Sequence, residues 1–282
     1  MIKGKRINKS SMEITDDLIL TALQTAVKAG TAIMDVYREP FGVELKSDNS
    51  PLTIADKRAH AIISQGLSNT GIPLLSEEGM HADYSIRKSW SHYWLVDPLD
   101  GTKEFIKRNG DFTVNIALIS NKQPVFGVVY APVPGFLYWG SKSGSYRLNI
   151  LGQKNNYTDG FKLYSEGVEQ LPCLPENKEY IVLGSRSHMN AETESFIKNL
   201  QQSHPDLAFI SRGSSLKFCA LAEGGADVYP RFGPTMEWDT AAGHAVAFFA
   251  GCSVLQVDNG LPVVYNKPSL LNPFFIARRK KK

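Results

Sequence analysis

Two aspartates stand three residues apart in the segment Asp97-Pro98-Leu99-Asp100-Gly101-Thr102, which directly follows the apolar stretch His92–Val96. The proline fixes the turn and removes one backbone donor, so both carboxylates and the Leu99 carbonyl can face one point. Hard divalent cations such as Mg²⁺ prefer these oxygen ligands. A plainer alternative is a turn in which Asp100 only caps a helix. The length of the motif, with its apolar lead-in, favours the metal site.

The same motif ends in Gly101-Thr102, which is expected to open a helix through Lys103-Glu104-Phe105. Free backbone N–H groups at the start of a helix bind phosphate oxygens. A metal site beside such a cradle is the arrangement that phosphoryl transfer requires. The motif therefore predicts metal-assisted hydrolysis of a phosphate ester.

Further carboxylates stand where they could complete this site. Glu77-Glu78 follow an apolar run, and because adjacent side chains diverge, one of the two is expected to be a ligand; the alternative is a solvated pair on a loop. Asp239, in Trp238-Asp239-Thr240, is placed at the start of a helix, where a carboxylate either caps the helix or closes the metal site from the second half of the chain.

Asp56 is the last residue of Thr53-Ile54-Ala55-Asp56, which has the form of a capping box. The functional alternative is a carboxylate that orients Thr102 or a metal-bound water. Thr102 is a weak base by itself, but it could pass a proton from water to Asp56 and so position hydroxide for in-line attack.

The sequence lacks the motifs of zinc enzymes, serine hydrolases and P-loop enzymes. The histidines have no His-x-x-x-His spacing, which argues against zinc. Neither a Gly-x-Ser-x-Gly elbow nor a Walker loop occurs, which excludes the usual serine hydrolases and P-loop enzymes. The three cysteines are odd in number and far apart, so we expect no disulfide framework and a reducing cytoplasm as the location.

The net charge of +3 comes from the end of the chain, where Arg278-Arg279-Lys280-Lys281-Lys282 carry five positive charges. Without them 26 basic residues face 28 acidic ones, which argues against a nucleic-acid-binding surface. We expect a solvated, disordered tail; weak peripheral contact with an anionic membrane is the alternative.

No apolar run is long enough for a transmembrane span, and the basic, polar segment Met1–Ser11 does not resemble a secretory signal.

The 282 residues divide by pattern into two parts. Periodicity fades between residues 149 and 178, which predicts an α+β metal- and phosphate-binding part over 1–175 and an α/β nucleotide-binding part over 176–282. Residues 42–49 are expected to form a turn. The expected helices are 16–39, about 52–67, 191–202, 215–223 and 238–250; the expected strands are 92–96, 113–119, 125–131, 180–183, 207–211, 226–229 and 253–257, with further short strands over 135–146.

Three separated motifs resemble the inositol monophosphatase superfamily of metal- and lithium-sensitive phosphatases: Glu77-Glu78, Trp94–Thr102 and Trp238–Gly243. The resemblance covers about residues 15 to 275 and implies a layered, alternating α-β-α-β-α sandwich. Within the superfamily the chain looks like the bacterial CysQ-type 3′(2′),5′-bisphosphate nucleotidases, because Tyr93–Gly110, Gly213–Cys219 and Tyr229–Thr235 are typical of them.

The resemblance implies a role for each candidate residue. Two or three Mg²⁺ ions would be bound by Glu77, Asp97, Asp100, Asp239 and the Leu99 carbonyl. Asp56 and Thr102 would activate the attacking water, and the Gly101 and Thr102 amides would hold the scissile phosphate. The rest of the nucleotide would be surrounded by Ser214, Ser215, Lys217 and Arg231. The full set expected to touch the substrate is Glu77, Leu99, Asp100, Gly101, Thr102, Ser214, Ser215, Lys217, Arg231 and Asp239.

The family substrate implied is adenosine 3′,5′-bisphosphate, cleaved to AMP and phosphate, with the 3′-phosphorylated adenylyl sulfate as a second; clearing it supports sulfate assimilation. Inositol phosphatases place a glutamate seven residues before the final metal aspartate, where this chain has Phe232. An apolar ring suits a nucleotide better than a polyol. The alternatives are an inositol monophosphatase, a sugar bisphosphatase, or a non-catalytic nucleotide-binding protein. Certain bacterial relatives are peripheral on the inner membrane, which keeps the basic tail of interest.

Overall fold

A seven-stranded sheet forms the centre of the computed structural model, which describes residues 13–46, 51–151, 166–175, 179–185 and 189–280. Its strand order is β3-β4-β5-β6-β7-β8-β9, and all neighbours are antiparallel except β3 and β4. Most residues of β4 to β7 are buried, because helices cover both faces of the sheet. The strands are β3 Leu74–Ser76, β4 His92–Asp100, β5 Thr113–Ser120, β6 Gln123–Ala131, β7 Phe136–Ser141, β8 Gly144–Asn149 and β9 Glu169–Gln170.

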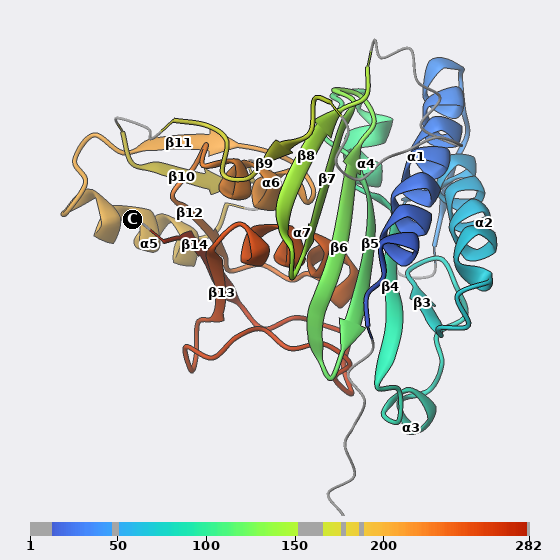
Figure 1. Cartoon of the computed structure of the whole chain (residues 1–282). Helices are drawn as coiled ribbons and strands as arrows, with labels where there is room; N and C mark the ends of the chain where they lie inside the picture. Colours follow the sequence, from blue (N-terminus) through green and yellow to red (C-terminus); the bar gives the residue numbers. More distant parts are fainter. Residues whose placement is uncertain (1–12, 47–50, 152–165, 176–178, 186–188, 281–282) are drawn as a thin grey trace, which may run out of the picture.

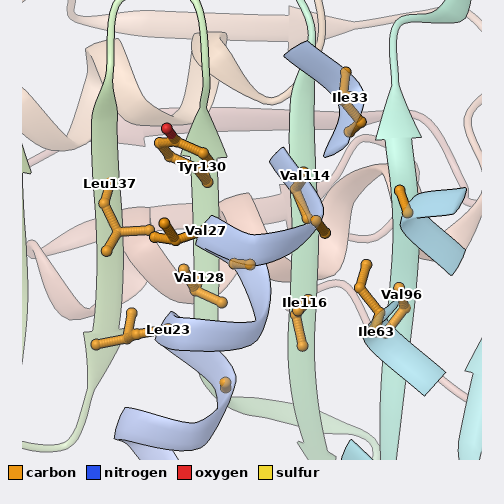
Figure 2. Close-up of a cluster of buried hydrophobic side chains, with 14 of the residues drawn as sticks. Leu23, Val27, Ile33, Ile63, Val96, Val114, Ile116, Val128, Tyr130 and Leu137 are labelled. Atoms are coloured by element: carbon orange, nitrogen blue, oxygen red, sulfur yellow. The ribbon is translucent and has the colours of Figure 1, made fainter. Parts of the chain in front are cut away.

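Two long helices, α1 (Asp16–Arg38) and α2 (Ile54–Ser68), pack on one face of this sheet. Figure 2 shows Leu23 and Val27 of α1 beside Val128 and Leu137 of the sheet. The apolar stripe at helical spacing that predicts both helices is thus the stripe that they bury. Burial of this stripe holds the N-terminus of α2, which carries Asp56, against the end of β4.

The opposite face of the sheet packs against α7 (Glu237–Phe249), which lies between the two sheets together with α6 (Leu216–Glu223) (Figure 1). Two glycines allow α7 to approach closely. A Cβ atom at Gly127 would lie 2.6 Å from the Ala242 carbonyl oxygen, and one at Gly140 would lie 2.9 Å from that of Ala245. This close packing fixes the position of the first turn of α7, which carries Asp239.

The second sheet has the order β11-β10-β12-β14-β13. Phe275 of β14 stacks on Phe218 of α6, whereas its near neighbour Arg278 lies over the ring of Phe196 in α5 (Ala191–Gln201). Because these two β14 residues point to opposite faces, α5 covers the outer face. The layers therefore alternate α-β-α-β-α, as the resemblance implied. The strands are β10 Ile181–Gly184, β11 Ala208–Ser211, β12 Val228–Arg231, β13 Cys252–Gln256 and β14 Phe275–Arg279.

The predicted elements that fall on described residues are present, mostly with ends shifted by one or two positions. The tail prediction is wrong for Arg278 and Arg279, since both lie in β14 and the Arg279 guanidinium pairs with Asp227 at 3.2 Å. The predicted turn over 42–49 contains strand β1 (Val43–Leu45), which pairs with β2 (Pro51–Thr53). A further short helix, α3 (Tyr84–Arg87), was not expected.

The first sheet ends with β9 and the second begins with β10, and the predicted division at 175/176 falls between them. We keep the two-part division as a proposal. Part of the stretch 149–178, the segment 1–12 and residues 281–282 lie outside the described residues. None of the helices in the described part of the chain combines the length and apolarity that crossing a bilayer needs.

Candidate active site

A bulge at the end of β4 brings its two aspartates to one site. Asp97 pairs with Asn115 of β5 and Asp100 pairs with Thr113, so three steps on β4 oppose two on β5. In a regular strand, residues three apart point to opposite faces, and the extra residue removes this alternation. Pro98 fits here because it has no N–H to pair, and the Leu99 N–H donates to the Asp97 Oδ1 atom at 3.0 Å.

Carboxylates from three elements meet in this region. Glu77, directly after β3, lies beside β4 because its N–H donates to the Val96 carbonyl at 3.0 Å. Oxygens of Glu77, Asp97 and Asp239 lie within 4.8 Å of one another, and Asp100 lines the same cavity as Glu77 and Asp239. This donor set consists of hard oxygen atoms only, which fits Mg²⁺ and does not suit a metal that prefers nitrogen or sulfur.

Burial and crowding raise the pKa values of this cluster. Burial, followed by repulsion from Glu77, Asp100 and Asp239, raises the pKa of Asp97 well above its usual range. Burial and then the Asp100 charge raise the pKa of Asp239 to about 8. The pKa of Asp100 reaches only about 6, because Lys217 and hydrogen bonds from Asn115 and Ser215 oppose the effect of burial. Carboxylates that repel one another in this way favour a divalent cation, which replaces their protons.

Sequence reasoning missed Lys46, which reaches the same carboxylates from the end of β1. Its Nζ atom lies 2.7 Å from the Glu77 Oε1 atom and also contacts Glu78 closely. Burial alone would lower the pKa of Lys46, but attraction to Glu77 and Glu78 outweighs it and raises the pKa. The two glutamates do not diverge as expected, because both carboxylates contact the Lys46 ammonium. Of the two, Glu77 is the one whose carboxylate is grouped with Asp97 and Asp239. A single lysine in an irregular segment gives no signal in the sequence that would place it here.

Asp56 makes the contacts expected for both of the alternatives considered for it. Its Oδ2 atom accepts the Thr53 N–H at 2.7 Å and the Thr53 hydroxyl at 2.6 Å, as in a capping box. Its Oδ1 atom is 3.1 Å from the Thr102 hydroxyl, which also lies 3.3 Å from the Leu99 carbonyl oxygen. Burial raises the pKa of Asp56, although these hydrogen bonds oppose the rise. The capping contact therefore holds the carboxylate in place for Thr102.

The expected helix after the motif is α4 (Thr102–Ile106), with Gly101 as its N-cap at φ 95°. This left-handed conformation is rarely open to other residues. A Cβ atom at Gly101 would also lie 2.2 Å from the Ser214 hydroxyl oxygen. Gly101 and Thr102 both line the cavity that holds the carboxylates.

The candidate nucleotide contacts divide into two groups. Ser214, Lys217 and Arg231 line the cavity, which has a volume of about 270 Å³. Burial lowers the pKa of Lys217 to about 8, although Asp100 opposes the effect, and its ammonium donates to the Arg212 and Ser214 carbonyls at 3.1 and 2.9 Å. The Arg231 Nε atom is buried with no partner within the described part of the chain. Ser215 is not in the cavity wall; its hydroxyl donates to the Asp239 carbonyl at 2.9 Å.

Phe232 does not lie where the sequence argument needed it. Its ring packs 5.7 Å from Phe196 and 6.2 Å from Phe274, and it is not part of the cavity wall. Arg231, the neighbouring residue, faces the cavity instead. The choice between a nucleotide and a polyol therefore gains no support from Phe232.

An acidic, oxygen-only centre beside a glycine-capped helix start, set between the layers of an α-β-α-β-α sandwich, is characteristic of the metal-dependent phosphatases. A sequence model described as the inositol monophosphatase family matches residues 15–279. This match spans nearly the whole chain, and the chain belongs to that family.

Similar proteins agree with this assignment. The chain is 46% identical to the 3′(2′),5′-bisphosphate nucleotidase CysQ of Shigella flexneri over 257 residues, which cover 89% of this chain and 96% of that protein. It is 45% identical to the CysQ of Escherichia coli K12 over the same length. Among solved structures, CysQ of Bacteroides thetaiotaomicron is 47% identical, with a TM-score of 0.82, and covers 93% of this chain and 97% of that one. SuhB of Bartonella henselae, at 23% identity and a TM-score of 0.71, shares the fold.

Proposed function

We propose that this chain is a Mg²⁺-dependent phosphomonoesterase that hydrolyses the 3′-phosphate of adenosine 3′,5′-bisphosphate to give AMP and phosphate. The observation that carries the proposal is that acidic and basic side chains line the same cavity. Glu77, Asp100 and Asp239 line this cavity together with the cations Lys217 and Arg231. A substrate with one phosphate for a metal centre and a second for protein cations fits this combination. Similarity to CysQ nucleotidases over most of the chain supports the same substrate class.

Glu77, Asp97, Asp100, Asp239 and the Leu99 carbonyl are the proposed ligands of two, or three, Mg²⁺ ions. When bound, Mg²⁺ supplies charge stabilisation for the phosphate oxygens and lowers the pKa of a water molecule. With Mg²⁺ bound, these residues would hold the substrate phosphate through the metal, and for this reason they are counted among the proposed substrate-binding residues.

Thr102 and Asp56 are proposed to handle the proton of the attacking water. The Thr102 hydroxyl can donate to the Asp56 Oδ1 atom, 3.1 Å away, while its oxygen accepts a hydrogen bond from the water. The raised pKa of Asp56 makes it a better acceptor for that proton. The Gly101 and Thr102 amides then orient the scissile phosphate at the start of α4.

Ser214, Lys217 and Arg231 are proposed to hold the part of the nucleotide that carries the second phosphate. Lys217 already uses two donors on backbone carbonyls, so it offers its remaining proton in a fixed direction. Arg231 uses one nitrogen on the Pro234 carbonyl at 2.8 Å and can direct its other donors towards an anion. Ser215 supports this group from behind the cavity wall.

The 3′-phosphorylated adenylyl sulfate is the proposed second substrate, and removal of the 3′-phosphate product supports sulfate assimilation. An inositol monophosphatase or a sugar bisphosphatase would use the same metal centre. A binding protein without activity is disfavoured because every proposed ligand is present. Turnover at saturating Mg²⁺ should be compared on adenosine 3′,5′-bisphosphate, inositol 1-phosphate and a sugar bisphosphate. A preference for either of the last two would overturn the substrate assignment and leave the metal chemistry intact.

For the location of the protein, the cytoplasm is a proposal, and so is weak membrane contact by the tail.

A further inference from the structure

Asn115 lies directly behind Asp100, on the side away from the cavity. Two groups donate to the Asp100 Oδ2 atom: the Ser215 N–H at 2.7 Å and the Asn115 side-chain amide at 3.2 Å. An oxygen surrounded in this way cannot turn freely, so the carboxylate has one orientation. Because Asp100 also lines the cavity, that orientation directs it to the metal centre.

The orientation of the Asn115 amide is itself fixed by its neighbours. The Thr113 hydroxyl lies 3.0 Å from the Asn115 Oδ1 atom, which can only accept, so Thr113 donates there. The amide nitrogen then has two protons, one for Asp100 and one for the Ser215 hydroxyl oxygen at 3.0 Å. Asn115 and Thr113 are fully buried, so water does not replace any of these contacts.

Ser215 extends this arrangement to the other half of the metal site. Its hydroxyl oxygen accepts from Asn115 and its proton is donated to the Asp239 carbonyl at 2.9 Å. Asp239 stands in the first turn of α7, and its own carboxylate accepts the Met236 N–H at 2.8 Å. Asn115 is therefore connected to Asp100 directly and to the backbone of Asp239 through one hydroxyl.

We infer that Asn115 is a positioning residue that holds Asp100 and, through Ser215, Asp239 in the geometry that binds Mg²⁺. Partners of this kind behind the ligands commonly change metal affinity about 10–100-fold when removed. The inference rests on the proposed metal-ligand role of Asp100 and Asp239. It also gives Ser215 a different role from contact with the nucleotide, because both of its hydroxyl contacts are made inside the protein.

The test is Mg²⁺ affinity, measured by calorimetry, in the purified full chain and in the variants Asn115→Leu and Ser215→Ala. Asn115→Leu keeps the approximate shape and removes the amide, and we expect its Kd for Mg²⁺ to rise about tenfold or more. The KM for adenosine 3′,5′-bisphosphate at saturating Mg²⁺ should change much less. Because both residues act through one chain of hydrogen bonds, the double variant should lose little more than the worse single one.

Two further variants keep the test interpretable. Thr113→Val preserves shape in the strand but frees the Asn115 amide to turn; a weaker Mg²⁺ affinity in this variant supports the inference even if Asn115→Leu does not fold. Ser145→Ala removes a buried hydroxyl that donates to the Trp139 carbonyl at 3.2 Å, away from the site, and should leave Mg²⁺ affinity unchanged.

The outcomes separate this inference from the proposed function. Wild-type Mg²⁺ affinity in folded Asn115→Leu and Thr113→Val would overturn the positioning role while the enzyme activity stands. A Ser215→Ala variant that raises only the KM for the nucleotide would also overturn it, in favour of substrate contact. Weakened Mg²⁺ binding in these variants, in a protein that releases no phosphate from the nucleotide, would support the positioning role and reject the proposed function.

Discussion

The ammonium of Lys46 lies 2.7 Å from the carboxylate of Glu77, so a lysine of the β1–β2 hairpin contacts one of the proposed metal ligands. Both side chains are largely shielded from solvent, which strengthens the pair. A divalent cation that binds Glu77 must compete with this lysine.

Lys46→Met should therefore lower the melting temperature in EDTA more than in Mg²⁺. Without the lysine, Glu77 and Glu78 lose a cation that offsets their repulsion, and only Mg²⁺ can replace it. The measurement is thermal unfolding in both solutions. Lys57→Met is the matched control, because its pair with Glu44 is exposed and should matter little in either solution. Equal losses in EDTA and Mg²⁺ for Lys46→Met would contradict this account.

Stability in EDTA should fall as the pH rises from about 4 to about 8. The pKa of Asp100 is about 6 and that of Asp239 about 8, both above the ordinary value of 3.8. The folded protein therefore holds these protons at pH values where the unfolded chain has lost them, and this stabilisation disappears as the pH passes through the folded pKa values. Mg²⁺ removes the repulsion, so its increase in melting temperature should be larger at about pH 8 than at about pH 6.

The control for this pH effect is Asp239→Asn, which removes one charge from the cluster. The variant should be less destabilised by high pH in EDTA than the natural chain is. A Mg²⁺-induced shift that is the same at both pH values would mean that the cluster does not exchange protons for metal.

Thr102→Val should lower kcat about 10²-fold or more while the Mg²⁺-induced rise in melting temperature stays. The variant keeps the shape of the side chain and removes the hydroxyl that lies 3.1 Å from Asp56. Steady-state kinetics with thermal unfolding in Mg²⁺ separates the two effects. A variant that retains kcat, or that loses the response to Mg²⁺, would show that Thr102 does not act on the proton.

The two ends of the basic tail should behave differently. Removal of residues 281–282 should leave phosphatase activity unchanged, whereas Arg279→Ala should cost roughly 3 kcal/mol of unfolding free energy because it leaves the buried Asp227 carboxylate without its cation. Urea unfolding and an activity assay test both statements. If Arg279→Ala were as stable as the natural chain, the ion pair between Arg279 and Asp227 would not contribute to stability as stated here.

The sequence was most informative where a local pattern is also a structural one. The apolar stripe of residues 16–38 predicts α1, and the apolar lead-in to Asp97 predicts the strand that delivers it. Strand β14 was missed because Phe275–Arg279 ends in charged residues that look like a solvated tail. The strand exists because it pairs with β12 and β13. These partners lie far away in the sequence, so a local pattern does not contain that information.

The candidate site shows the same limit. Acidic residues in motifs could be predicted because metal chemistry requires them. Lys46, Asn115 and Thr113 could not, because their roles come from contacts with residues distant in the chain. Phe232 was misplaced because counting from Asp239 gives a position in the chain but not the direction of a side chain, and the ring packs on Phe196.

The most direct test of the central claim is phosphate release from adenosine 3′,5′-bisphosphate, measured with and without Mg²⁺ in the natural chain and in Asp97→Asn. We predict rapid release that requires Mg²⁺ and is abolished in Asp97→Asn, because this variant removes the negative charge of a proposed metal ligand in the carboxylate cluster. Release that does not depend on Mg²⁺, or that continues in Asp97→Asn, would contradict the account.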